Sequence, residues 1–126
     1  MNPILVELFS KYDFHSECKN EIYELLIDHS VTKDFTRLFQ KNTEILEQLT
    51  YRATYNSNFE KLQGEDAKDL YVMKFKSPHL NARIIYTYIQ GKLALLLCCF
   101  YERSDSEDTY HKYIPIANAR KKEMEG

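Results

Sequence analysis

Cysteine, glycine and strong net charge are all scarce in this sequence, and each scarcity excludes a class of protein. There are three cysteines in 126 residues, and none has the spacing of a metal site. Two of them, Cys98 and Cys99, are adjacent, so on a strand they would point to opposite faces and could not easily pair. These cysteines favour a reducing, cytoplasmic compartment, and we expect no metal and no cofactor.

The sequence also lacks long apolar runs and glycine-rich motifs. The apolar run at 93–100 is too short to span a bilayer, and no basic region followed by a long apolar segment marks a signal peptide. With three glycines, the chain contains no phosphate-binding loop, no dinucleotide fingerprint and no nucleophile elbow. We therefore expect one cytoplasmic domain over residues 1–126, with no membrane partner and no small-molecule cofactor.

The net charge gives little guidance about partners. The 17 basic and 19 acidic residues leave a formal charge of −2. This balance provides no overall attraction to nucleic acid or to an anionic membrane, so any such contact must come from a local basic patch. Hydrophobic residues make up 44% of the chain, which is enough to bury a core.

Three runs with strand character dominate the second half of the chain. They are residues 70–75, 83–89 and 93–101. The first run alternates Leu70 and Val72 with Tyr71 and Met73, and the second is rich in β-branched and aromatic residues. The third is apolar at both odd and even positions, which indicates a strand covered on both faces. Gln90 and Gly91 predict a tight hairpin between the second and third runs, whereas residues 76–81 predict a longer turn between the first and second. We expect an antiparallel meander with the third run in its middle.

Helical patterns precede this meander. Apolar residues at helical spacing predict one helix at 16–29, capped by Ser16, and a second at 32–49, capped by Thr32. Residues 30–33 would separate the two helices. The apolar faces of such a pair need a sheet to cover, and the meander supplies one.

A terminal helix is expected at 110–125, with its regular part beginning near Tyr113, because Pro115 is tolerated only within a first turn. The apolar run at 4–9 can form an added strand, and residues 51–69 are polar and irregular. The predicted fold class is therefore α+β: two N-terminal helices packed on an antiparallel β-meander, followed by a C-terminal helix.

Arg83 is the first candidate for chemistry. It lies in an otherwise apolar strand, so the sheet would aim its planar guanidinium at one face, where it can hold a phosphate. The alternative is a salt bridge to Asp69 or Glu60. Glu60 can serve as a general base if it lies near Arg83, or it is an ordinary surface glutamate. Lys74 and Lys76 would form a compact basic group beside this aromatic strand.

Other polar side chains complete the set of candidates. Arg103, at the end of the third run, can supply a second cation or only balance the acids around it. Side chains able to donate a proton or to stack on a base are Tyr110, Tyr113, His79 and His111. Each tyrosine is one of ten, so packing alone can account for any of them. The candidate RNA-binding residues are Lys61, Lys74, Lys76, His79 and Tyr110.

The order of these pieces resembles a known family. The segments FEKLQGEDAKDLYVMKF, NARIIYTYIQGKLALLLCCFYER and YIPIANARKKE follow the approximate pattern of the RelE/ParE/HigB-type toxins. The matching residues are Glu60, Leu62, Gly64, Leu70, Tyr71, Arg83, Ile84, Ile85, Tyr86, Ile114, Ala117 and Arg120. The resemblance covers residues 59–125, and much of its specificity lies in order and spacing.

The resemblance implies a RelE-like fold and a toxin of a bacterial or phage type II toxin–antitoxin system. Such toxins are often metal-independent, ribosome-dependent endoribonucleases that inhibit translation: the 2′-hydroxyl of the mRNA attacks the adjacent phosphate, and protein groups orient it and neutralise charge. By carry-over, Arg83 would stabilise that phosphate and Glu60 would be the base. Arg103 and Tyr113 fall near the positions where members of that family have an arginine and a proton-donating side chain. The implied partners are a cognate antitoxin and mRNA on the ribosome.

The sequence departs from the family just after the third run. Many relatives carry lysines there, where this chain has Glu102 and the acidic segment 102–108. A second interpretation therefore stays open, in which a non-catalytic protein of the same fold inhibits a protein target such as gyrase or only binds a partner. The acidic segment would attract a basic stretch of an antitoxin.

Overall fold

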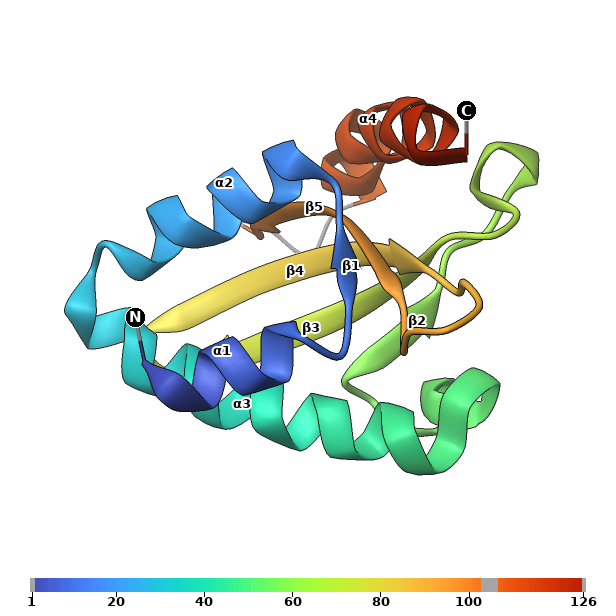
Figure 1. Cartoon of the computed structure of the whole chain (residues 1–126). Helices are drawn as coiled ribbons and strands as arrows, with labels where there is room; N and C mark the ends of the chain where they lie inside the picture. The colour runs from blue at the N-terminus through green and yellow to red at the C-terminus, as the bar shows by residue number, and fades with distance from the viewer. Residues whose placement is uncertain (1, 103–106, 126) are drawn as a thin grey trace.

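The computed structural model describes residues 2–102 and 107–125, and in that part of the chain helices cover both faces of a mixed β-sheet (Figure 1). The strands are β1 Asp13–Phe14, β2 Phe59–Lys61, β3 Tyr71–Ser77, β4 Leu80–Thr87 and β5 Leu95–Tyr101. Their order is β1-β5-β4-β3-β2, so β4 takes the middle position predicted for the run at 93–101. The α+β class is confirmed, but the sheet is not purely antiparallel, because β1 pairs in parallel with β5.

The helices divide unequally between the two faces of the sheet (Figure 1). They are α1 Pro3–Phe9, α2 Ser16–Leu26, α3 His29–Leu49 and α4 Glu107–Glu125, with short 3₁₀ helices η1 Thr50–Tyr55 and η2 Glu65–Ala67. The first three pack on one face, around buried rings that include Phe35, Phe39 and Phe75, and α4 packs on the other. The predicted helix pair on one face is confirmed. Within the described ranges, no helix is long and apolar enough to cross a membrane.

β5 contributes side chains to both cores, as β3 and β4 also do. Leu96 and Cys99 belong to the core under the first three helices, while Leu97 and Cys98 belong to the core under α4. This arrangement confirms that a run apolar at both parities is covered on both faces. It also keeps Cys98 and Cys99 on opposite faces of the sheet, and both are free and buried.

The turn between β3 and β4 is tighter than predicted. Ser77 pairs with Leu80, so only Pro78 and His79 connect the two strands. The longer turn predicted at 76–81 is therefore wrong, and the strands extend into it. The pairs of the extended ends, Ser77 with Leu80 and Lys76 with Asn81, continue the register that places Lys74 opposite Arg83.

The turn between β4 and β5 is longer than predicted. It comprises residues 88–94, so the two-residue hairpin at Gln90 and Gly91 is wrong, although Gly91 does take a positive φ of 85°. β4 ends at Thr87, and the hydroxyl of the next residue, Tyr88, donates to the backbone oxygen of Thr50 at 2.7 Å.

Capping side chains fix where the first helices begin. Residues 3–9 form α1 rather than an added strand, because the Asn2 side chain accepts a hydrogen bond from the backbone N–H of Ile4 and Pro3 takes the first position. Helix α2 begins at Ser16 as predicted, but its cap is His15, whose Nδ1 accepts from the backbone N–H of Glu17 at 3.1 Å.

The break between α2 and α3 also lies elsewhere than predicted. α3 begins at His29, because Asp28 caps it by accepting from the backbone N–H of Ser30 at 3.0 Å. Thr32, the predicted cap, lies inside the helix and donates its hydroxyl to the backbone oxygen of Leu26 at 3.0 Å. The predicted break at 30–33 is therefore wrong.

The C-terminal helix is longer than predicted. α4 begins at Glu107 and continues through Pro115, which is exposed, so the start predicted near Tyr113 is wrong. Residues 51–69, predicted to be irregular, contribute β2 at the edge of the sheet together with η1 and η2.

Candidate functional site

The strand register brings several predicted site residues to one face of the sheet. Lys74 pairs with Arg83 across β3 and β4, and Glu60 pairs with Val72 across β2 and β3. Residues opposite each other in an antiparallel pair, and residues two apart on one strand, share a face. Glu60, Lys74 and Arg83 therefore lie on the α4 face. Tyr110 of α4 joins them, because its hydroxyl accepts from Arg83 Nε at 3.4 Å. We call these four residues the Arg83 cluster.

Arg83 is the buried member of the cluster, with only 2% of its surface exposed. Its Nη1 donates to Asn81 Oδ1 at 2.7 Å and to the backbone oxygen of Ala82 at 3.1 Å. A guanidinium covered in this way cannot contact a phosphate in this arrangement. It acts instead through its charge and by holding Tyr110. Asn81 was not among the predicted site residues, although its position two residues before Arg83 places it on the same face.

Glu60 and Lys74 form the accessible part of the cluster. Lys74 Nζ lies 3.1 Å from Glu60 Oε1, and their side chains are 19% and 43% exposed. An acid and a cation thus meet at the surface, directly beside the buried Arg83. The other acid considered as a partner of Arg83, Asp69, lies 3.9 Å from Lys121.

Tyr110 supplies a hydroxyl group to the cluster. Burial raises the pKa of Tyr110 above its ordinary value, and the hydrogen bond and charge of Arg83 oppose that rise only in part. The phenol therefore keeps its proton near neutral pH and can donate it. Because α4 carries Tyr110 over the sheet, the helix and the strands together build the site.

Glu102 differs most from its prediction as an exposed acid. It is buried, and its Oε1 accepts a hydrogen bond from the Thr109 hydroxyl at 2.9 Å. Its backbone N–H and oxygen both bond to Asn81, at 2.8 and 2.9 Å. The carboxylate thus helps to hold the start of α4 against β4. Arg103, the predicted second cation, lies outside the described residues, as do residues 104–106.

Tyr113 packs rather than joining the cluster. Its ring stacks on Phe100 with centroids 4.0 Å apart and planes inclined by 6°, and Lys112 Nζ lies 5.3 Å from its ring centroid. The stacked Tyr113 and Phe100 rings pack the middle of α4 against β5. The predicted role of Tyr113 as a proton donor has no support in these contacts.

The remaining RNA-binding candidates differ in position: Lys76 shares a face of β3 with Lys74, as predicted, whereas Lys61 does not lie on that face. Lys76 is exposed and pairs with Asn81 at the end of β3, and His79 is exposed on the turn that follows. Lys61 projects from the opposite face and donates to the backbone oxygens of Leu62 and Ala67, both at 2.8 Å. Burial lowers the pKa of Lys61. Lys61 therefore stabilises the loop after β2 and lies apart from the Arg83 cluster.

Arg120, the last residue of the resemblance, fastens α4 to the rest of the molecule. Its Nη1 and Nη2 donate to the two carboxylate oxygens of Glu21 at 2.8 and 2.9 Å, and Nη1 also donates to the backbone oxygen of Leu97. Glu21 accepts a further bond from the backbone N–H of Cys99. A two-point contact of this kind is what a planar guanidinium provides. Arg120 is thus a structural residue.

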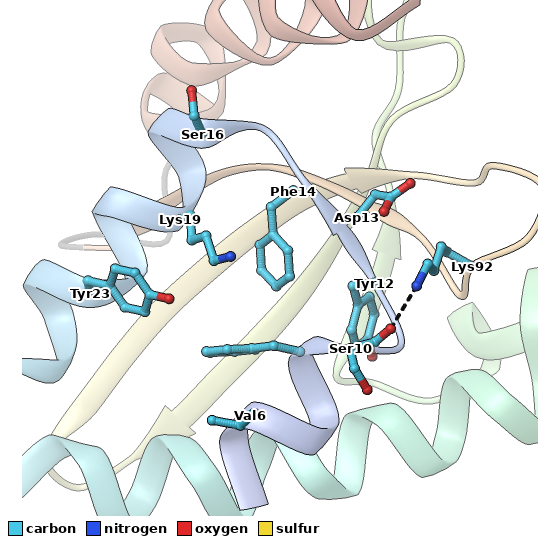
Figure 2. A pocket seen from close by; sticks show the side chains of 10 residues that line it. Val6, Ser10, Tyr12, Asp13, Phe14, Ser16, Lys19, Tyr23 and Lys92 are labelled. Carbon is cyan, nitrogen blue, oxygen red and sulfur yellow. Dashed lines mark hydrogen bonds between the residues drawn. The ribbon is translucent and has the colours of Figure 1, made fainter. Parts of the chain in front are cut away.

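A separate hollow of about 640 Å³ lies between α1, β1 and α2 (Figure 2). Its walls include Phe14, Tyr23 and Lys19, whose Nζ lies 5.6 Å from the Phe14 ring centroid. Lys92 at its rim donates to the backbone oxygen of Ser10. None of the predicted site residues lines this hollow, so it is distinct from the Arg83 cluster.

No protein-family model, no curated protein and no solved structure matches this chain. The chemistry available to the protein must therefore be inferred from its own side chains. The Arg83 cluster combines an accessible carboxylate, an accessible ammonium, a buried guanidinium and a protonated phenol on one face of the sheet. Such a set can bind a phosphate group and can transfer protons beside it.

Proposed function

We propose that the protein is the toxin of a type II toxin–antitoxin pair and that it cleaves RNA at the Arg83 cluster. The observation that carries this proposal is the convergence of Glu60, Lys74, Arg83 and Tyr110, from three strands and α4, on one face of the sheet. A base, an acid and fixed positive charge are what phosphodiester cleavage by a 2′-hydroxyl requires. The RelE-like arrangement of sheet and helices, and action on mRNA at the ribosome, belong to the same proposal.

Each group in the cluster has one step in this reaction. Glu60 accepts the proton of the RNA 2′-hydroxyl, the 2′-oxygen bonds to phosphorus, and the bond from phosphorus to the 5′-oxygen breaks. Lys74 leaves Glu60 to neutralise the charge on the phosphate oxygens, and Tyr110 donates its proton to the departing 5′-oxygen. The products are a 2′,3′-cyclic phosphate and a 5′-hydroxyl. Glu60 then loses its proton to water, and Tyr110 regains one.

Arg83 is a positioning residue in this scheme. Its hydrogen bond to the Tyr110 oxygen orients that hydroxyl, and its buried charge lies beside Lys74 in the strand register. A fixed positive charge in a poorly hydrated place favours the negative charge that develops on the phosphate, without contact between the two.

Induced expression followed by growth curves and mapping of mRNA ends tests the proposal. We expect Glu60→Gln and Lys74→Gln each to lower cleavage by about 10²–10³, because each removes a group that acts only in the transition state. Glu44→Gln and Lys41→Gln, exposed on α3 and outside the cluster, are matched controls that should cleave normally. Cleavage by both cluster variants at the wild-type rate would contradict the proposal.

The burial of Arg83, together with the exposure of Tyr51 and Tyr55, favours a second function. A non-catalytic protein of this fold that inhibits a protein target such as gyrase, or only binds a partner, needs exposed aromatic contact area rather than a reacting group. In that case expression arrests growth without new mRNA ends, and Glu60→Gln remains fully toxic. That combination would replace the first function by the second.

The proposal includes a cognate antitoxin as partner. The expectation that the antitoxin docks on the acidic segment at 102–108 loses the contribution of Glu102, because Glu102 is buried and bonded to Thr109. Residues 103–106 lie outside the described residues. Co-expression of the neighbouring small open reading frame should restore growth, and the protein that it encodes should co-purify with this chain. Arrest that persists despite co-expression and co-purification would contradict this pairing.

A further inference from the structure

Another pocket, of about 300 Å³, lies where β3 begins and β4 ends, at the far end of these strands from the β3–β4 turn. Its walls come from η1, β3, the turn after β4 and the last turns of α4. The side chains that give it its character are Tyr51, Tyr71, Tyr88, Asp69, Lys121 and Glu125. We call it the tyrosine pocket. None of its residues belongs to the Arg83 cluster.

The three tyrosine rings are inclined walls rather than a stack. The Tyr51 and Tyr88 ring centroids lie 4.4 Å apart with planes at 54°, and those of Tyr71 and Tyr88 lie 4.9 Å apart at 72°. Tyr51 is 65% exposed, so one of its faces is available to a ligand. Aromatic faces carry negative potential, so the exposed face of Tyr51, held by its packing on Tyr88, can attract a cation.

The backbone beside the pocket is strained in a way that fixes this geometry. Thr50 has φ 51° and is the one non-glycine residue with positive φ in the described ranges. A β-branched residue is disfavoured there, and such strain persists only when the surroundings hold it. The hydrogen bond from the Tyr88 hydroxyl to the Thr50 oxygen does so. It directs the next residue, Tyr51, onto the Tyr88 ring.

The charges around the pocket favour a cation over an anion. Asp69 and Glu125 line it with mostly exposed carboxylates, and Lys121 lies 3.9 and 3.0 Å from them, so the lining residues sum to −1. The Tyr71 ring already attracts one cation, since Lys61 Nζ lies 5.2 Å from its centroid. A phosphate chain entering the pocket would meet both carboxylates, which disfavours RNA there.

We propose that the tyrosine pocket binds the guanidinium of an arginine side chain on a partner polypeptide. A guanidinium can lie flat on the exposed Tyr51 ring and donate two parallel hydrogen bonds to a carboxylate, whereas an ammonium has no such planar fork. Asp69 and Glu125 supply the carboxylates once Lys121 moves aside. This proposal goes beyond RNA cleavage and does not depend on it.

Titration with Nα-acetyl-arginine amide, followed through the ring NMR signals of labelled tyrosine, tests the proposal. We expect saturable shifts at Tyr51, Tyr71 and Tyr88. The citrulline analogue has nearly the same shape without the charge, and we expect it to bind about tenfold more weakly or less. Equal binding of the two compounds, or no binding of either, would overturn the proposal.

Matched variants locate the site. Tyr51→Ala should weaken arginine binding about tenfold, whereas Tyr55→Ala should not change it. Tyr55 is also on η1 and is 83% exposed, but it does not line the pocket. Lys121→Gln should strengthen binding severalfold, because it frees both carboxylates, and a gain cannot come from misfolding. Arginine binding that is unchanged in Tyr51→Ala, or weaker in Lys121→Gln, would overturn the proposal. So would a uridine hexanucleotide that shifts the signals of the same rings more strongly than the arginine compound does.

Discussion

Arg83 shows at the scale of a single residue how burial changes the meaning of a charge. Strand parity predicted only that its side chain reaches one face of the sheet; the structure places it opposite Lys74, on the face that α4 covers. Its cover comes from Tyr110, which is far away in the sequence, so no local pattern could predict that the guanidinium is enclosed. A surface salt bridge would have contributed little to stability, whereas an enclosed and multiply bonded arginine contributes much more.

Arg83→Ala should therefore lower the free energy of unfolding by about 3 kcal/mol, because it leaves a cavity and removes the donors that Asn81 and Tyr110 oxygens use. Urea unfolding followed by circular dichroism measures the change. Lys76→Ala, exposed on the neighbouring strand, is the control and should change stability by less than about 0.5 kcal/mol. Equal stability of the two variants would show that Arg83 is not enclosed.

Thr50→Gly should make the protein more stable by about 1 kcal/mol, since glycine adopts positive φ without the steric cost that threonine bears. Thermal unfolding of the variant measures this gain. Thr54→Gly, on the same 3₁₀ helix but without positive φ, should instead be destabilising. A loss of stability in Thr50→Gly comparable to that in Thr54→Gly would contradict the strained geometry.

At the scale of elements, sequence periodicity predicted faces better than it predicted ends. The parity of β5 predicted two covered faces, and the apolar stripes predicted the helices that cover one of them. The ends depended on single hydrogen bonds, such as the Asn2 cap of α1 and the Asp28 cap of α3. The site depends on the register of the β3–β4 hairpin, which pairs Phe75 with Ala82 and so places Lys74 opposite Arg83.

The burial of β5 on both faces also makes the protein less stable at alkaline pH. Burial raises the pKa of Cys98 from its ordinary value of 9.0 to about 12, and it raises the pKa of Cys99 and Cys18 as well. Above pH 9 the unfolded chain loses thiol protons that the folded chain keeps, so the free energy of unfolding falls as pH rises from about 9 to about 12. Below that window these thiols contribute no pH dependence.

Urea unfolding at about pH 7 and about pH 11 should reveal this loss in the wild-type protein. Cys98→Ala should lose less stability between the two pH values, because it removes one of the titrating thiols while leaving the others. An identical loss in both proteins would place the alkaline sensitivity in other groups.

At the scale of the whole molecule, α4 links three features that are far apart in the sequence. Its first turns carry Tyr110 to the Arg83 cluster, its middle covers β5, and its last turns carry Lys121 and Glu125 to the tyrosine pocket. Arg120 fastens the helix to α2 through Glu21. The near-neutral chain attracts no polyanion as a whole, so the proposed RNA binding must depend on the local charge of Lys74 and Arg83.

Cleavage of a defined mRNA by the purified protein on translating ribosomes is the decisive test of the proposed RNA cleavage. The proposed chemistry predicts cuts that leave 2′,3′-cyclic phosphate ends, that vanish when the nucleotide before the cut carries a 2′-deoxy sugar, and that fall by about 10²–10³ with Glu60→Gln but not with Glu44→Gln. Cleavage by Glu60→Gln at the wild-type rate, or growth arrest by a wild-type protein that leaves the mRNA intact, would contradict it.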